Sequence, residues 1–398
     1  MYTWILAAFV LSGCGFQATV SSDQGDASTT FDGPPRPDGA MSTGDDVVHV
    51  RTEDEYTGID DLTITAPITI DTDRMLFGMS LPPGATFGAA KQDGAGPELA
   101  ILHVRKLDVR ATIRGLGSRP LVVIADSIEL TETIDVTAHH DQPGPGALSS
   151  GPGAGQPGQH VAPDTDSGGG GGGHGTPGGP GGSTGCTTCL DQRLDGGRGG
   201  APYNPEIATL VGGSPGGRAD LPALTSCNTP ASGAGGGAIE LYARTRILIS
   251  GYINAGGGGG RGGDDCLGNG LAGSGGGAGG AIVLQSPSIE NSGRLSANGG
   301  GGGAGAGGGT SDVEANVGDG NDGALGTTVA AGGAASGTSG ARGGDGAVAA
   351  AGAAGGKTTS FTSGNAGGGG GGVGQILMLY KTRVAAGVTS PTATTKLY

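Results

Sequence analysis

Two neighbouring stretches, ILHVRKLDVRATIRGLG (101–117) and VVIADSIELTETIDVTA (122–138), share one layout and decide the fold. Each contains an apolar segment, a short break, a second apolar segment and a turn. Apolar and polar residues alternate within the segments, which predicts short β-strands with one buried face. The aligned pairs, each 21 residues apart, are Ile101 and Val122, Leu107 and Ile128, Val109 and Leu130, and Ile113 and Ile134. The two stretches therefore read as successive copies of one structural unit.

Further copies of this layout follow along the chain. AIELYARTRILISGYINAGG (238–257) matches AIVLQSPSIENSGRLSANGG (281–300) when one residue is deleted between them. A shorter copy is QILMLYKTRVAAGVTS (375–390), and TITAPITIDTDRMLFG (63–78) is a candidate opening copy. A unit of about 20 residues with short strands cannot bury its apolar row alone, so copies stack to form a continuous core.

The repeats resemble the parallel β-helices of pectin-lyase-like enzymes and bacterial adhesins. The resemblance implies an all-β fold: a right-handed parallel β-helix-like solenoid with long glycine-rich inserts leaving from one edge. The alternative is a β-sandwich with long glycine-rich loops. The predicted parts are a signal peptide (1–13), an acidic disordered tether (14–61), N-terminal solenoid coils (62–141), coils at 238–255, 281–298 and 375–398, and glycine-rich inserts at 142–237, 256–280 and 299–374.

Glycine dominates the inserts, with 93 Gly and 22 Pro in 398 residues. Each insert starts just after a coil and ends just before the next strand, so stacked coils would place the inserts side by side. In composition they resemble the polyglycine-II sandwiches of some phage tail-tip adhesins and of a glycine-rich antifreeze protein. That resemblance implies packed polyproline-II-like chains with three residues per turn. Partial order and fully flexible loops are the alternatives, because we found no clean every-third-residue register in the sequence.

The N-terminus carries an export signal. A short apolar run, ILAAFVL (5–11), precedes Leu11-Ser12-Gly13-Cys14, which resembles the lipobox of bacterial lipoproteins. The resemblance implies lipidation of Cys14, attachment to a membrane through that lipid and a place in the cell envelope. Gly15 implies the outer membrane. An ordinary cleaved signal with an incidental cysteine is the alternative. Eleven acidic and two basic residues in 15–61 predict a solvated spacer behind the anchor.

Four further cysteines, Cys186, Cys189, Cys227 and Cys266, all lie in the glycine-rich inserts. An even number in an exported protein predicts two disulfides, and three pairings are possible. Disulfides between different inserts would cross-link chains that have little apolar core. The spacing does not provide the second close pair that a zinc site needs.

Signals for metals are few in this sequence. GGRGGDDCL (259–267) and VGDGNDGAL (317–325) resemble the calcium-binding glycine-aspartate nonapeptide, which makes Asp264 and Asp322 calcium candidates. His139-His140-Asp141 would need a further ligand, His160 or His174, to hold a metal. We predict no metal site and no cofactor.

Composition excludes several classes of function. A net charge of −15 and a pI near 4.6 argue against nucleic acid as a partner. Motifs for a catalytic serine, a zinc protease or a phosphate-binding loop are missing, and the charged residues of the coils are scattered. We therefore expect a lipid-anchored surface protein that acts structurally or adhesively on surface glycans or other cells. The alternatives are a carbohydrate-active β-helix enzyme and an ice- or polysaccharide-binding module.

Overall fold

The structure is a computed structural model that describes most of the chain from residue 47 onward. All described residues belong to one compact unit, Gly44–Tyr398. The described residues are 47–93, 96–161, 165–185, 193–219, 230–263, 265–266, 269–307, 317–335, 340–349, 352, 355, 364–385 and 387–397.

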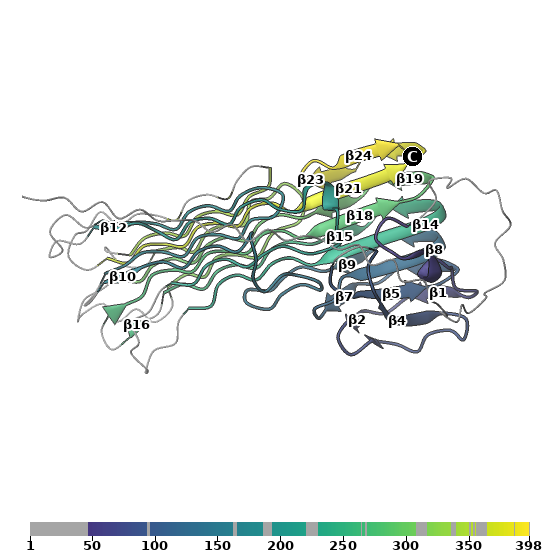
Figure 1. Cartoon of the computed structure of the whole chain (residues 1–398), viewed down its shortest axis with the longest axis horizontal. Coiled ribbons are helices and arrows are strands. Elements are labelled where there is room, and N and C mark those ends of the chain that lie inside the picture. The colour runs from purple at the N-terminus through teal and green to yellow at the C-terminus, as the bar shows by residue number, and fades with distance from the viewer. Residues whose placement is uncertain are drawn as a thin grey trace, which may run out of the picture. The chain divides into compact units, whose positions relative to one another are not determined.

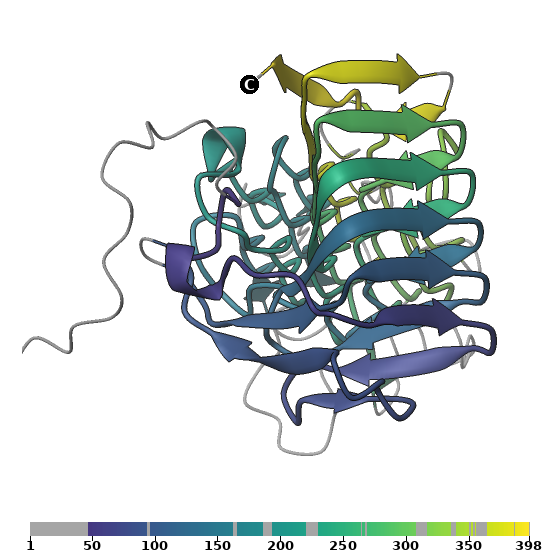
Figure 2. The same ribbon diagram turned by 90° about the vertical axis from the view of Figure 1, so that its right-hand side faces the viewer.

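The fold is almost entirely β, with 32% of residues in strands and 2% in helices. Two large sheets form a strand stack, in which strands follow one another in chain order from purple to yellow (Figure 2). The first sheet has a row of seven parallel strands: β1 (Asp61–Ile64), β6 (Lys106–Val109), β8 (Leu121–Leu130), β14 (Ala238–Ile249), β18 (Ala281–Gln285), β21 (Gln375–Tyr380) and β24 (Thr394–Leu397). Beside this row lie β4 (Thr86–Ala90), β5 (Leu99–His103), β19 (Ser288–Asn291) and β22 (Thr382–Ala385).

The second sheet runs alongside the first and contains the short strand of each repeat. Its order is β23 (Val388–Ser390), β20 (Arg294–Ser296), β15 (Tyr252–Asn254), β9 (Thr133–Asp135), β7 (Ile113–Leu116), β2 (Ile68–Asp71) and β3 (Leu76–Phe77). Only β3 pairs antiparallel in this sheet. Each repeat thus gives one long segment to the first sheet and one short segment to the second.

The strand register confirms the repeat alignment made from the sequence. Ile101 pairs with Val122, and the other three aligned pairs are likewise direct neighbours on parallel strands. The one-residue deletion is also confirmed, because Ala238 pairs with Ala281 whereas Arg246 pairs with Ser288. The predicted opening copy is present as β1 and β2, which pair with β6 and β7.

The predicted right-handed parallel β-helix-like solenoid is wrong, because the structure is not a closed solenoid. The chain forms two main sheets, one of them a large parallel sheet with seven parallel strands in a row, and the coils do not close. The physical reason lies at Ala138, Ala255 and Ala297, where the chain leaves the second sheet in a glycine-rich insert and does not return directly to the first (Figure 1).

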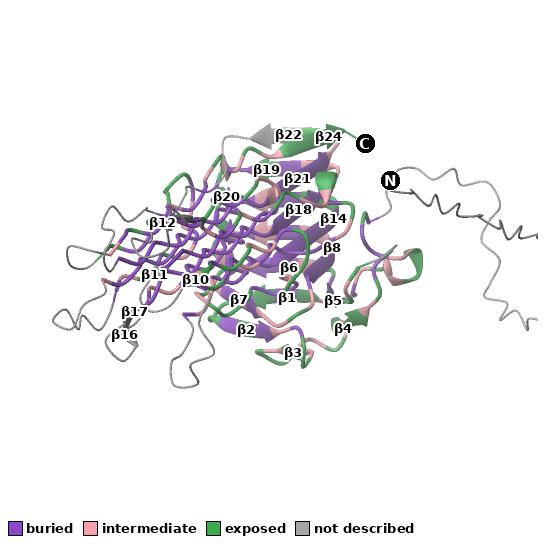
Figure 3. Cartoon of the chain, turned by 60° about the vertical axis from the view of Figure 1, so that its left-hand side comes forward, coloured by how far each residue is buried: buried purple, intermediate pink, exposed green. Residues whose placement is uncertain are grey.

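The main core lies between the two sheets and is built from one face of most of their strands, whereas β24 is exposed along its length. Leu107, Ile128, Ile247 and Ile289 are at most 1% exposed and belong to it. Alternate residues of the first sheet point to its outer face, where a second apolar cluster forms. That cluster is covered by residues 47–50 and 207–210, so part of the predicted tether packs on the domain (Figure 3).

The remaining elements are short. The described residues contain two helices, the 3-10 turns η1 (Thr52–Asp54) and η2 (Pro205–Ile207). Within the described parts of the inserts there are three antiparallel hairpins: β10 (His160–Val161) with β11 (Thr165–Asp166), β12 (Thr184–Gly185) with β13 (Arg193–Leu194), and β16 (Asp265–Cys266) with β17 (Asn269–Gly270). Among the described residues, no helix has the length and apolar character needed to cross a membrane.

Candidate functional site: a glycine lattice

The glycine-rich inserts form an ordered bundle of extended chains, here called the glycine lattice. It runs away from the strand stack, and hairpins β10–β11, β12–β13 and β16–β17 lie at its far end (Figure 1). Its main stretches are 152–159, 167–175, 176–183, 193–201, 211–219, 230–237, 255–263, 271–280, 297–307, 317–326, 330–335, 340–347 and 364–374. The expectation that different inserts touch is confirmed for these residues, because they hydrogen-bond to one another throughout.

The stretch Gly168–Gly173 shows the geometry of the lattice. Its backbone N–H groups donate to three other stretches in strict rotation, over N–O distances of 2.7–3.1 Å, and its carbonyls accept from three more. Residues three positions apart therefore bond to the same neighbouring stretch, as expected for a polyproline-II helix with three residues per turn. Six neighbouring stretches surround the chain. The donor pairs are Gly168 and Gly171 to 176–183, Gly169 and Gly172 to 271–280, and Gly170 and Gly173 to 152–159; the carbonyls accept from 193–201, 211–219 and 364–374.

At the interior glycines this packing leaves no room for a Cβ atom. A Cβ atom on Gly275 would lie 2.0 Å from the carbonyl oxygen of Gly170, and one on Gly371 would lie 1.9 Å from that of Gly277. The obstacle is backbone in both cases, which cannot rotate aside. The glycine content is therefore a requirement of close backbone approach, and the lattice interior is buried (Figure 3).

On the outer chains of the lattice, side chains point outward at every third position. Residues separated by two glycines, such as Pro177 and Pro180, are exposed, while the glycines between them are buried. Three residues of such a chain rise about 9 Å. Other outward series are Asp195, Arg198 and Ala201, and Ala331 and Ala334. The outer faces thus carry side chains at a regular spacing.

Carboxylates cap the lattice edge, and the calcium candidate Asp322 is one of them. Asp322 accepts the backbone N–H groups of Gly259 and His140, both at 2.8 Å, and its second oxygen lies 3.0 Å from His139 Nδ1. Burial favours the neutral acid, but these N–H groups outweigh it and lower the pKa of Asp322. Asp319, three residues earlier, accepts Gly262 N–H at 2.8 Å. These carboxylate oxygens already accept hydrogen bonds, so a cation could bind them only by breaking those bonds.

Asn365 joins three stretches of the lattice through one buried amide. Its side-chain NH₂ donates to the carbonyls of Gly270 at 2.6 Å and Ala306 at 3.0 Å, and its oxygen accepts Asp166 N–H at 3.0 Å. The residue is fully buried. It therefore replaces the backbone bonds that the ends of the lattice chains would otherwise lack.

His174 lies fully buried where the lattice meets the strand stack. Its Nδ1 lies 2.9 Å from the carbonyl of Gly279, and its ring stacks on Tyr203 with centroids 4.8 Å apart. Burial lowers the pKa of His174 to about 4, so the ring is neutral at ordinary pH. Because Nδ1 faces a carbonyl, the proton of the neutral ring resides on Nδ1.

We expect the neutral His174 to make the fold sensitive to acid. The unfolded chain takes up the proton near the ordinary pKa of 6.5 and the folded chain only near 4, so stability falls as pH drops through this window. The loss amounts to about 3 kcal/mol. Urea unfolding at several pH values measures it, and His174→Gln removes this part of the pH dependence. Identical pH profiles for the two chains would contradict the prediction.

Most of the other predicted site residues lie outside the described part of the chain. These are Cys14, Cys186, Cys189, Cys227 and Asp264, and of Cys266 only the backbone in β16 is described. Lipidation and the disulfides therefore stay predictions. His139, His140 and Asp322 do come together, but among the described residues no group of three or more His, Cys, Asp or Glu has the geometry of a metal site.

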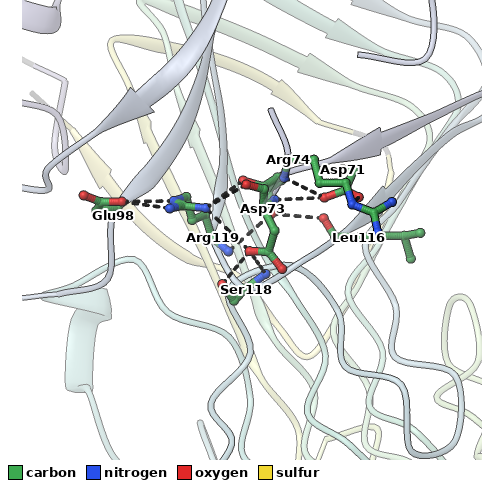
Figure 4. A network of polar contacts seen from close by, with 8 residues as sticks. Asp71, Asp73, Arg74, Glu98, Leu116, Ser118 and Arg119 are labelled. Carbon is green, nitrogen blue, oxygen red and sulfur yellow. Dashed lines mark hydrogen bonds and ion pairs between the residues drawn. The ribbon is translucent and has the colours of Figure 1, made fainter. Parts of the chain in front are cut away.

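Charged residues elsewhere on the strand stack pair with one another. Arg114 lies 2.6 Å from Asp135, and Lys106 lies 3.3 Å from Glu129 on the neighbouring strand. At the N-terminal corner, Asp73 accepts the N–H and hydroxyl of Ser118, and Arg119 contacts Glu98 at 3.0 Å (Figure 4). These contacts tie turns and strands together, as in a solvated outer face.

The sequence contained one signal that our reading missed. The triplets PGGPGG (177–182), DGGRGG (195–200) and RGGDGA (342–347) place a side chain at every third residue. They mark the outer chains of the lattice, whereas unbroken glycine runs mark chains such as 168–173 that are enclosed on all sides.

Comparison with protein-family models, with curated proteins and with solved structures found no match.

Proposed function

We propose that this chain is a non-catalytic structural and adhesive module of the cell surface, held to the membrane by lipid at Cys14. The observation that carries the proposal is the glycine lattice, in which enclosed chains such as Gly168–Gly173 are bonded to six neighbours. Ordering glycine is costly, at about 1–2 kcal/mol per residue for the backbone alone. A flexible spacer would need no such order, so the lattice favours a role as a rigid arm.

The arrangement of the arm supports a role in attachment. The strand stack holds one end of the lattice, and the hairpins lie at the other (Figure 1). Exposed side chains repeat along the outer chains at every third residue. A repeating face suits many weak contacts with an extended partner such as a surface glycan, because linked contacts add up to avidity. The mutual pairing of the charged residues on the strand stack supports a function without catalysis.

The test compares cells that display the full chain with cells that display two glycine variants. Gly275→Ala disrupts the lattice, whereas Gly88→Ala places a methyl group in open space on β4. We expect the wild type and Gly88→Ala to adhere equally to glycan-coated surfaces and to other cells, and Gly275→Ala to lose adhesion. Equal adhesion by all three chains would refute an adhesive arm.

Two further measurements test the other parts of the proposal. Incubation with polysaccharides, read by new reducing ends and unsaturated uronates, would overturn the non-catalytic role if turnover appeared. Metabolic labelling with palmitate tests the anchor. We expect Cys14→Ala to lose the label and to leave the membrane fraction, and a variant that still fractionates with membranes would remove the anchor.

A further inference from the structure

Residues 47–50, here called the N-terminal strap, lie on the outer face of the first sheet. Val47 and Val50 are each 3% exposed and belong to the apolar cluster of that face. The N–H of Val48 donates to Gln285 Oε1 on β18 at 3.1 Å. The carbonyl of His49 accepts Asp93 N–H at 3.0 Å. The strap is the first described segment of the chain, and residues 1–46 precede it in the sequence.

His49 fixes the strap to two other parts of the fold. Its Nδ1 lies 2.8 Å from Glu240 Oε2 on β14, and its Nε2 lies 2.7 Å from the carbonyl oxygen of Ile207. Ile207 belongs to the loop 203–210 that covers the same face of the sheet. The His49 side chain is 1% exposed and that of Glu240 is 0% exposed. Water therefore does not compete for these two bonds.

The two bonds require one more proton than a neutral histidine facing a carboxylate provides. A carbonyl and a carboxylate only accept hydrogen bonds, whereas a neutral imidazole has one donor and one acceptor nitrogen. Both contacts form if the ring is an imidazolium, or if the proton resides on Glu240 and is donated to Nδ1. Either way the pair shares one extra proton. Without that proton, one ring nitrogen of His49 is an acceptor that faces another acceptor, either the Glu240 carboxylate or the Ile207 carbonyl oxygen.

Glu240 is the charged group in direct contact with the His49 ring, and other charged residues nearby pair with each other. Further along the chain, the half-buried Arg51 faces the exposed Glu53 at 3.8 Å. Glu206 in the covering loop pairs with Lys396 at 2.7 Å. Asp93 contacts His49 through its backbone. Burial opposes the charge, but Glu240 and the Ile207 carbonyl outweigh it and raise the pKa of His49.

We propose that His49 and Glu240 form a proton-dependent latch that fastens the N-terminal strap to the strand stack. With the shared proton present, both ring nitrogens are bonded and the strap is closed. When pH rises and the proton leaves, one bond is lost, and the buried Glu240 carboxylate, whose Oε1 has no hydrogen-bond partner among the described residues, loses its compensating charge. The strap then detaches and lengthens the connection to the N-terminal region by about 14 Å when extended. That the added length extends a membrane tether rests on the proposed function. The latch itself does not rest on it.

Hydrogen exchange of the full-length protein at pH 5.5 and 8.5 tests the latch. Rates are expressed as protection factors, which removes the intrinsic pH dependence of exchange. Because the latch links one proton, we expect protection at 47–50 to fall by up to about tenfold per pH unit as pH rises from the ordinary histidine pKa of 6.5 toward the raised pKa of latched His49, while β14 keeps its protection. Protection that is equal at the two pH values would overturn the latch.

Glu240→Gln is the matched variant. A glutamine amide can donate to the neutral ring at Nδ1 while Nε2–H donates to the Ile207 carbonyl, so the variant needs no extra proton. We expect protection of its strap to be independent of pH. A fall in protection equal to that of the wild type would overturn the proposal. An NMR titration of the His49 ring needs no variant: its midpoint should coincide with the loss of strap protection, and separate midpoints would refute the coupling.

Discussion

Replacing Gly275 with alanine is expected to disrupt the glycine lattice and to destabilise the fold by more than about 4 kcal/mol. The new Cβ would lie 2.0 Å from the carbonyl oxygen of Gly170 and 2.5 Å from its carbonyl carbon. The backbone of 271–280 cannot shift, because it is bonded to neighbours on all sides. Chemical denaturation and amide exchange in the glycine stretches measure the effect.

Gly88→Ala is the control for this prediction, because it makes the same chemical change on β4 where a Cβ meets nothing within 4 Å. We expect its stability to differ from the wild type by less than about 1 kcal/mol. If Gly275→Ala proved as stable as Gly88→Ala, with equally slow exchange, the glycine stretches would not be packed as described.

The second large effect is expected at Asn365. Asn365→Ala leaves the carbonyls of Gly270 and Ala306 and the N–H of Asp166 without the side-chain partner they have now. An unsatisfied buried group costs about 1–3 kcal/mol, so the combined loss is on the order of 4 kcal/mol. Thermal unfolding with calorimetry measures it.

Asn321→Ala provides the comparison, since the side chain of Asn321 is exposed on an outer chain of the lattice. We expect a change within about 0.5 kcal/mol at this site. Equal losses at Asn321 and Asn365 would show that the buried amide contributes nothing special to the lattice.

The strand register could be predicted because its signal is local. Alternation of apolar residues, as in Ile128 and Leu130, sets which face of a strand is buried, and a slip by one residue would expose that row. Stacking copies in this register places equivalent residues side by side, so Leu107 beside Ile128 follows from the alignment. The sequence also indicated that the inserts leave the strands at equivalent places.

Closure of the coils could not be predicted from the same pattern. Alternation identifies strands, but it does not say whether the chain returns to the first sheet or departs, as it does after Ala138. The pairing of His49 with Glu240 joins residues 191 positions apart and has no local signal. Asp322 matched a calcium motif because glycine and aspartate also occur together where a carboxylate caps backbone N–H groups.

The long reach of the lattice bonds affects how the protein can be made. Gly369 N–H bonds to the carbonyl of Gly169, two hundred residues earlier, and Gly372 N–H bonds to that of Gly172. During synthesis these backbone groups of the first insert therefore lack their partners until the last insert has been made. A ribosome that stalls before residue 364 would release a chain whose early glycine stretches lack these late partners. Proteases would then have an accessible substrate in such an incomplete chain.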